Sequence, residues 1–280
     1  MVLCTALWGF QQVAIKVVAA DVSLVMQGAL RTVLATALLV AWALARRIPL
    51  FQRDGTLRAG LVAGLLFGVE FIFIYAGLAY TNASRMVVFI YLTPPLTALG
   101  VHFFLPGERL RPVQWTGVLL AFGGLVLAFS DGFLQGQPTW IGDLCGVAAA
   151  CLWAATTLVI RTTPLARATA TKTLFYQLGV SSLVLLAGTV LLGEPGIVRL
   201  TPLAAASLLY QGVIVAFASY LAWFWLLARY LAAPLSVFSF LTPLFGVAFG
   251  VLLLGERLSG AFALAAVLVG AGIALVNLRR

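Results

Sequence analysis

The feature that most constrains the fold is a succession of apolar stretches, each about 20 residues long, that takes up nearly the whole chain. Charges, prolines and glycines divide the 280 residues into ten of them: 2–20, 24–45, 57–79, 84–105, 112–130, 140–160, 172–192, 203–227, 233–254 and 260–278. A helix of about 20 residues rises about 30 Å, the thickness of the hydrocarbon core of a bilayer. Only 9% of the residues are charged, too few to cover a soluble domain of this size. The sequence therefore predicts an all-α integral membrane protein with ten transmembrane helices.

The positions of Lys and Arg predict which helix ends face the cytoplasm. With the N-terminus in the cytoplasm, twelve of the seventeen basic residues lie at cytoplasmic ends or loops: Arg46, Arg47, Arg53, Arg58, Arg109, Arg111, Arg161, Arg167, Lys172, Arg229, Arg279 and Arg280. Short loops rich in Lys and Arg stay on the cytoplasmic side. We therefore expect both termini to be cytoplasmic. The net charge of +9 is attributed to this topology and not to nucleic-acid binding, because the short loops leave no room for a soluble domain.

A repeated phrase relates the two halves of the chain. The segment "YLTPPLTALGVHFFLPGERL" at 91–110 returns as "FLTPLFGVAFGVLLLGERL" at 240–258. Earlier in each half, "LWGFQQVAIK" at 7–16 aligns with "LWAATTLVIR" at 152–161. The chain is thus interpreted as a duplicated unit.

The duplication predicts the domain organisation. We place the first five-helix repeat at 1–132, a linker at 133–136 and the second five-helix repeat at 137–280. Because five is odd, the second repeat enters the membrane from the opposite side, and the halves are expected to form a 5+5 inverted repeat. Such pairs build a substrate site near the midplane between the halves. A duplication without present mechanistic meaning is the alternative.

These features together resemble the drug/metabolite transporter superfamily, EamA type. The resemblance rests on the two groups of five spans, the Leu-Thr-Pro of spans four and nine, and the paired Gly-Glu-Arg-Leu, and it covers essentially the whole chain. It implies a multi-pass exporter of the bacterial inner membrane, with a cavity lined mainly by spans one, three, four, six, eight and nine. Trp8, Trp153 and Tyr91 are similar to the pattern of bacterial aromatic amino acid exporters in that superfamily.

Two matching stripes supply candidate substrate-binding residues. Span one carries Trp8, Gln11 and Gln12 at helical spacing, and span six carries Trp153 and Thr156. Amides and hydroxyls inside a bilayer must find partners or face water. We interpret the stripes as walls of the cavity, with the tryptophan rings holding a planar ligand. The alternative is that the polar residues form hydrogen bonds between helices.

Glu70 is the only acidic residue deep inside a predicted span. Because an unpaired carboxylate in contact with lipid is costly, Glu70 should face a cavity or a partner. We predict that it binds the ammonium group of a substrate or exchanges protons; a structural pair with Arg31 or Arg85 is the alternative. Its counterpart in the second repeat is Ser219, also predicted to bind substrate.

Prolines at matched positions, Pro94 and Pro243, are predicted to act in gating. Proline removes a backbone hydrogen bond and loosens a helix, and in transporters such breaks lie beside the site. A passive kink is the alternative. Tyr91 and Ser239, close before these prolines, are expected to border the same space and bind substrate.

Two further motifs are predicted to be structural. Gly60, Gly64 and Gly68 recur at four-residue spacing and let another helix approach closely, within the chain in preference to a homodimer seam. Glu108 and Glu256, in the paired Gly-Glu-Arg-Leu, are expected to cap the helix that follows each of them.

The remaining function classes fit less well. An intramembrane enzyme needs ligands or nucleophiles at depth, and the chain has no His-Glu-x-x-His and a single histidine. Phosphate carriers need buried cations, which the span interiors largely lack apart from Arg31. We predict an exporter of zwitterionic amino acids, aromatic ones favoured, without enzymatic activity, metal or cofactor. A monomer in the bilayer is favoured over a homodimer. Export of drug-like or purine-like planar molecules, and a pore without carrier function, are the alternatives.

Overall fold

The computed structural model describes residues 1–104, 109–134, 139–229 and 241–277, and every regular element in these ranges is a helix. The first half holds α1 (Val2–Val17), α2 (Leu24–Ala45), α3 (Leu57–Gly77), α4 (Ala83–Ile90), α5 (Thr93–Phe104) and α6 (Pro112–Leu134). The second half holds α7 (Thr139–Thr162), the 3-10 helix η1 (Pro164–Arg167), α8 (Ala170–Leu191), α9 (Pro202–Leu209), the π-helix η2 (Tyr210–Ser219), α10 (Tyr220–Arg229), α12 (Leu241–Leu254) and α13 (Gly260–Val276).

The helices have the length and composition of membrane spans. Among the described residues, six helical segments are long and apolar enough to cross a bilayer, and four shorter apolar helices accompany them. The prediction of an all-α membrane protein agrees with this. Large apolar side chains such as Leu119, Leu183 and Val190 are exposed on the outside of the bundle, as lipid contact requires.

The proline pair of span four interrupts its helix. α4 ends at Ile90 and α5 begins at Thr93, directly before Pro94, because Pro94 and Pro95 cannot donate the backbone bonds that a continuous helix needs. The hydroxyl of Thr93 donates to the carbonyl of Ile90 (2.7 Å) and holds the junction together. Pro243 lies in the first turn of α12, where its missing N–H costs no hydrogen bond.

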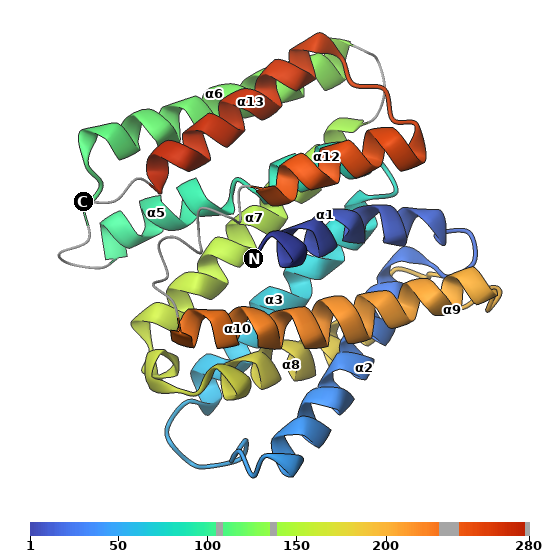
Figure 1. The fold of residues 1–280 in the computed structure, drawn as a ribbon, viewed down its shortest axis with the longest axis vertical. Coiled ribbons are helices and arrows are strands. Elements are labelled where there is room, and N and C mark those ends of the chain that lie inside the picture. The colour runs from blue at the N-terminus through green and yellow to red at the C-terminus, as the bar shows by residue number, and fades with distance from the viewer. Residues whose placement is uncertain (105–108, 135–138, 230–240, 278–280) are drawn as a thin grey trace.

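Helices of the two halves pack against each other throughout the bundle. α6 and α13 lie side by side at one edge, and α2 lies at the other (Figure 1). Between these edges α1 packs on α12, α3 packs on α7 and α8, and α7 also contacts α4 and α5. The halves are therefore intertwined, and the space between them belongs to both.

The glycine series of α3 is a packing seam inside the chain. Gly60, Gly64 and Gly68 all face α8, where an added Cβ at Gly68 would lie 2.8 Å from the Cβ of Val184. At Gly64 an added Cβ would collide with the backbone carbonyl of Tyr176. The absence of side chains thus lets α3 and α8 approach closely, as the spacing predicts.

Glu256 caps a helix of the other half. Its carboxylate accepts the backbone N–H groups of Ala83 (2.8 Å) and Ser84 (3.0 Å) at the start of α4. α13, the helix that follows Glu256 in sequence, is capped instead by the hydroxyl of Ser259 (2.9 Å). The prediction that Glu256 caps the following helix is wrong, because a local cap is already present and folding brings α4 to the carboxylate. Glu108 lies outside the described residues.

Candidate functional site

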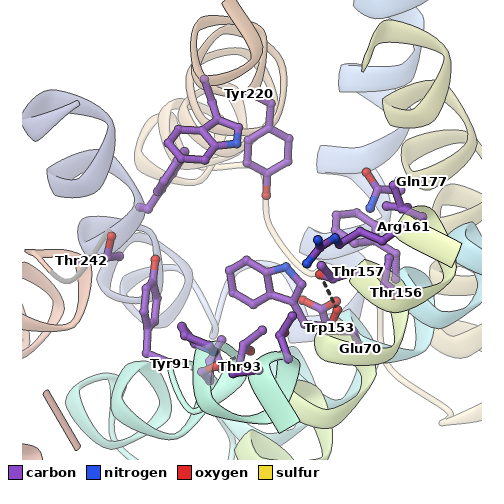
Figure 2. A pocket seen from close by; sticks show the side chains of 18 of the residues that line it. Glu70, Tyr91, Thr93, Trp153, Thr156, Thr157, Arg161, Gln177, Tyr220 and Thr242 are labelled. Carbon is purple, nitrogen blue, oxygen red and sulfur yellow. Dashed lines mark hydrogen bonds between the residues drawn. The ribbon is translucent and has the colours of Figure 1, made fainter. Parts of the chain in front are cut away.

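A cavity of about 1120 Å³ lies between the two halves (Figure 2). Its interior walls come from α1, α3, α4, α5, α7, α8, α10 and α12. Small-molecule sites typically enclose about 300–1,000 Å³, so this cavity has room for a small ligand and water around it.

One wall is a cluster of aromatic rings around Trp8. The centroid of its ring lies 6.4 Å from that of Tyr220 and 5.8 Å from that of Trp223, both in edge-to-face geometry. The indole Nε1 donates to the hydroxyl of Ser219 (2.8 Å), which fixes the orientation of the ring. Ser219 ends the π-helix η2, whose wider turns shift the register of the residues that follow; such segments are frequent at functional sites.

A second aromatic pair faces the first across the cavity. The rings of Tyr91 and Trp153 lie 6.0 Å apart at an interplanar angle of 81°. Figure 2 shows both of them, with Thr93, on the side of the cavity opposite Tyr220. Tyr91 is positioned by the interruption between α4 and α5, and Trp153 by α7. A planar group could therefore contact aromatic surface on both sides.

Glu70 places the deep acidic side chain in this cavity. Its side chain is 2% exposed, and its Oε2 has no hydrogen-bond partner among the described residues. Neither Arg31 nor Arg85 forms an ion pair with it: Arg85 pairs with Asp143 instead. The alternative of a structural pair with Arg85 is therefore wrong, whereas Arg31 lies near enough to interact with Glu70 electrostatically without a direct contact. Oε2 of Glu70 is left available to a ligand or water in the cavity.

Threonine hydroxyls on α7 add acceptor groups beside Glu70. Thr156 and Thr157 donate their own protons to backbone carbonyls four residues back, at 2.9 Å and 3.0 Å. Their oxygen lone pairs stay available to a ligand donor. Gln12 also contributes an amide oxygen that has no partner among the described residues.

The cavity opens at one end of the bundle. Its mouth is lined by residues from the ends of α7 and α13 and from the start of α6, including Arg109, Gln114, Arg161 and Asn277. Basic side chains at a mouth attract negatively charged groups from solution.

An ion pair at this open end ties the loop before α3 to α8. Lys172 Nζ lies 2.8 Å from Asp54 Oδ2, and the hydroxyl of Thr56 donates to the same carboxylate. The hydrogen bond from Lys172 and then that from Thr56 lower the pKa of Asp54 to about 2. Asp54 therefore keeps its charge, and this attachment, until the pH falls well below the usual range of a carboxyl group.

Polar cross-links within the first half and between the halves close the opposite end. Lys16 Nζ donates to the carbonyl of Thr81 (2.6 Å), and the hydroxyl of Thr81 donates to Asp143 (2.9 Å). Asp143 also forms the buried pair with Arg85. Glu194 from the second half caps the first turn of α2 (2.9 Å), as Glu256 caps α4. None of the described residues that line the cavity comes from this end.

A comparison with protein families identifies the chain. The EamA-like transporter family matches residues 1–130 and 140–278. The chain belongs to this family. Relatives of this EamA-like protein include a transporter of Archaeoglobus fulgidus described as uncharacterized, 27% identical over 89% of this chain and 86% of that protein. Another is a "Probable amino-acid metabolite efflux pump" of Escherichia coli, 24% identical over 97% of this chain and 91% of that protein. A crystal structure with 24% identity has the same fold, with a TM-score of 0.67 over 98% of this chain and 94% of that one.

The cavity of this EamA-like chain takes in most of the residues singled out from the sequence. It is lined by Trp8, Gln11, Gln12, Glu70, Tyr91, Pro94, Trp153 and Thr156. Ser219 does not line it and lies behind Trp8 as its hydrogen-bond partner. Pro243 does not line it either, because its neighbour Thr242 faces the cavity in its place. Ser239 lies outside the described residues.

Sequence reasoning missed several lining residues. Tyr220 and Trp223 form the wall around Trp8, and Phe67 and Phe71 flank Glu70. A signal was present for the first two: they are spaced three apart in "YLAWFW", directly after Ser219, on one helical face. Nothing distinguished the two phenylalanines from lipid-facing ones.

Proposed function

We propose that this EamA-like protein exports amino acids, preferring aromatic ones, by alternating access through the cavity between two inverted five-helix repeats. Its route would open at one end and close at the other, and exchange of these two states would move the substrate. The geometry of the cavity supports this proposal: it is accessible at the mouth near Arg161 and ends before the cross-links around Asp143. A closed end favours a carrier over a pore that stays open throughout.

Helix contacts support the inverted repeat. If each helix is replaced by its counterpart in the other half, the packing of α1 on α12 becomes the packing of α7 on α4 and α5. Both packings occur. α2 and α8 are counterparts of each other, and so are α6 and α13. Each of these two pairs is also in contact. Pairings of this kind are expected from a pseudo-two-fold axis between ten spans.

The single observation that carries the substrate assignment is a buried carboxylate between aromatic walls. Glu70 would bind the ammonium group, while the rings around Trp8 and Trp153 would hold the side chain. The name of the relative in Escherichia coli agrees with export of this substrate class. Aromatic walls alone would also accept a purine-like or drug-like planar molecule, so substrates with and without an amino acid head group must be compared.

The orientation can be tested by labelling. Single cysteines replacing Arg53 and Arg167, at the open end, should resist a membrane-impermeant thiol reagent on intact cells, because the basic loops are expected in the cytoplasm. A cysteine replacing Val198, an exposed residue at the closed end, should react. The background carries alanine at the three native cysteines. Reaction at the first two positions and protection at the third would reverse the orientation and make the cavity face outward.

The substrate preference can be tested at the two tryptophans. Trp8→Ala and Trp153→Ala should each weaken transport of phenylalanine about threefold to tenfold, because an aromatic pairing contributes about 0.5–1.5 kcal/mol beyond burial. Transport of threonine should change less. The measurement is counterflow of labelled amino acid in proteoliposomes, after equal insertion is checked. Trp42→Ala is the matched control, since Trp42 is exposed and does not line the cavity. Equal losses for both substrates would assign the tryptophans to packing or gating.

A further inference from the structure

Arg31 is a fully buried cation, and none of the described carboxylates contacts it directly. It lies on α2 with 0% exposure, and its guanidinium donates to the hydroxyls of Tyr75 (3.4 Å) and Tyr220 (3.3 Å). Its Cζ lies 4.4 Å from the centroid of the Phe71 ring. Its Nε has no partner among the described residues. All its described contacts are with neutral groups.

The second buried arginine shows how this fold neutralises a structural charge. Arg85 is also buried, and it contacts the carboxylate of Asp143 through two of its nitrogens. Burial of an unpaired charge is costly in a low-dielectric interior, and a direct partner offsets that cost. Arg31 differs: no described carboxylate contacts it directly, although Glu70 is close enough to act on it electrostatically.

Tyr220 connects Arg31 to the cavity. Its ring lines the cavity, and Figure 2 shows its hydroxyl directed into the interior, toward the side of Tyr91 and Trp153. The hydroxyl accepts a hydrogen bond from Arg31, and no described group accepts its proton in return. Tyr75 is the informative contrast, because it donates its proton to Gln211 (2.9 Å) and does not line the cavity. Of the two tyrosines that contact Arg31, only Tyr220 faces the cavity, and its hydroxyl proton is available to a ligand.

Opposite charges are thus placed close together around one space. Glu70 lines the cavity and is followed in sequence by Phe71, the residue whose ring lies against Arg31. An α-amino acid carries its ammonium and carboxylate groups on the same carbon atom, so a matching site needs a negative and a positive group at short separation. The arginines at the mouth do not meet this need, because Arg109 and Arg161 are exposed to solvent, where charges are screened.

We propose that Tyr220 and Arg31 form a subsite for the substrate's carboxylate, complementary to Glu70 for the ammonium group. The Tyr220 hydroxyl donates directly to the carboxylate. Arg31 is a positioning residue: it holds the Tyr220 hydroxyl by a charge-assisted hydrogen bond, which strengthens that hydroxyl as a donor and supplies positive charge behind it. The pair makes the cavity selective for the amino acid head group, in addition to the aromatic side chain. This inference rests on the proposed function and names the head-group chemistry of the same site.

The test compares three probes that share a phenyl ring: phenylalanine, phenethylamine, which lacks the carboxylate, and 3-phenylpropionate, which lacks the amine. Dissociation constants are measured on purified full-length protein by intrinsic fluorescence. Tyr220→Phe should weaken binding of phenylalanine and 3-phenylpropionate about tenfold, the loss of one hydrogen bond to a charged group. Binding of phenethylamine should change less than about twofold. Arg31→Gln should likewise weaken binding of phenylalanine and 3-phenylpropionate more than binding of phenethylamine. Arg31→Lys, which keeps the positive charge, should weaken binding of the two carboxylate probes less than Arg31→Gln does.

Tyr75→Phe is the matched control, since it removes the other hydroxyl that Arg31 holds, away from the cavity. It should leave the ratio of the phenylalanine and phenethylamine constants unchanged even where it lowers stability. Equal weakening of all three probes by Tyr220→Phe, or equal affinity of the unmodified protein for phenylalanine and phenethylamine, would overturn the carboxylate subsite. Neither of these results would contradict the proposed export of amino acids. Absence of amino acid counterflow by the unmodified protein would instead overturn the proposed function.

Discussion

Replacing Glu70 by Gln should reduce counterflow of phenylalanine at least about tenfold, because a hydrogen bond to a charged group contributes about 1.5–3 kcal/mol. The substitution keeps the shape of the side chain and removes its negative charge and its ability to titrate. Any pH dependence of transport across the neutral range should therefore become flatter as well. Counterflow in proteoliposomes, measured at a series of equal internal and external pH values, gives both quantities.

The controls for this result change the ligand in one case and the substituted side chain in the other. Binding of 3-phenylpropionate, which has no ammonium group, should not be weakened by Glu70→Gln, whereas binding of phenethylamine should be. Glu70→Asp keeps the charge and should retain part of the transport. Normal transport by Glu70→Gln at every pH would mean that this carboxylate neither contacts the substrate nor exchanges protons.

Replacing Arg85 by Met should destabilise the protein by about 3–5 kcal/mol, because it breaks a buried ion pair and removes the cation that directly contacts the buried carboxylate of Asp143. Asp143 is 0% exposed and also accepts a hydrogen bond from the hydroxyl of Thr81. Arg85 also donates to the carbonyl of Ala128 (2.8 Å) and lies against the ring of Phe262, so it joins α4, α6, α7 and α13 at the closed end. The measurement is the fraction of protein that stays monodisperse after heating in detergent.

A second ion pair at the same end is the matched control. Arg199 pairs with Asp21 at 2.9 Å, but its side chain is 68% exposed. Because exposed pairs contribute about 0–1 kcal/mol, Arg199→Met should change thermal stability little. Adding Asp143→Asn to Arg85→Met should recover part of the loss, since the buried negative charge of residue 143 is then removed as well. A loss for Arg85→Met no larger than that for Arg199→Met would contradict the assigned role of the buried pair.

The sequence by itself determined the local and periodic properties of this protein. A helix that crosses a bilayer satisfies its backbone within one segment, so the spans could be read from length and apolarity alone. The same solvent rule pointed to residues that line the cavity, because Glu70, Gln11 and Gln12 are too polar for lipid. Internal similarity then added Trp8 and Trp153 as a matched pair. Each of these inferences needs only the chain near the residue and the nature of the surrounding medium.

Only the tertiary structure decided which distant groups meet. Glu256 caps α4, 172–173 residues away in sequence, and Arg31 reaches Tyr220 across 189 residues. Many carboxylates and backbone N–H groups could satisfy one another, and the sequence contains no preference among them; helix packing selects the pairs that come within hydrogen-bond distance. The same reason explains why Phe71 could not be separated from lipid-facing phenylalanines, and why the open end of the cavity became visible only in three dimensions. The chemistry of a side chain determines which kind of partner it requires. The packing of α3 against α7 and α8, and of α1 against α12, determines which partner lies within reach.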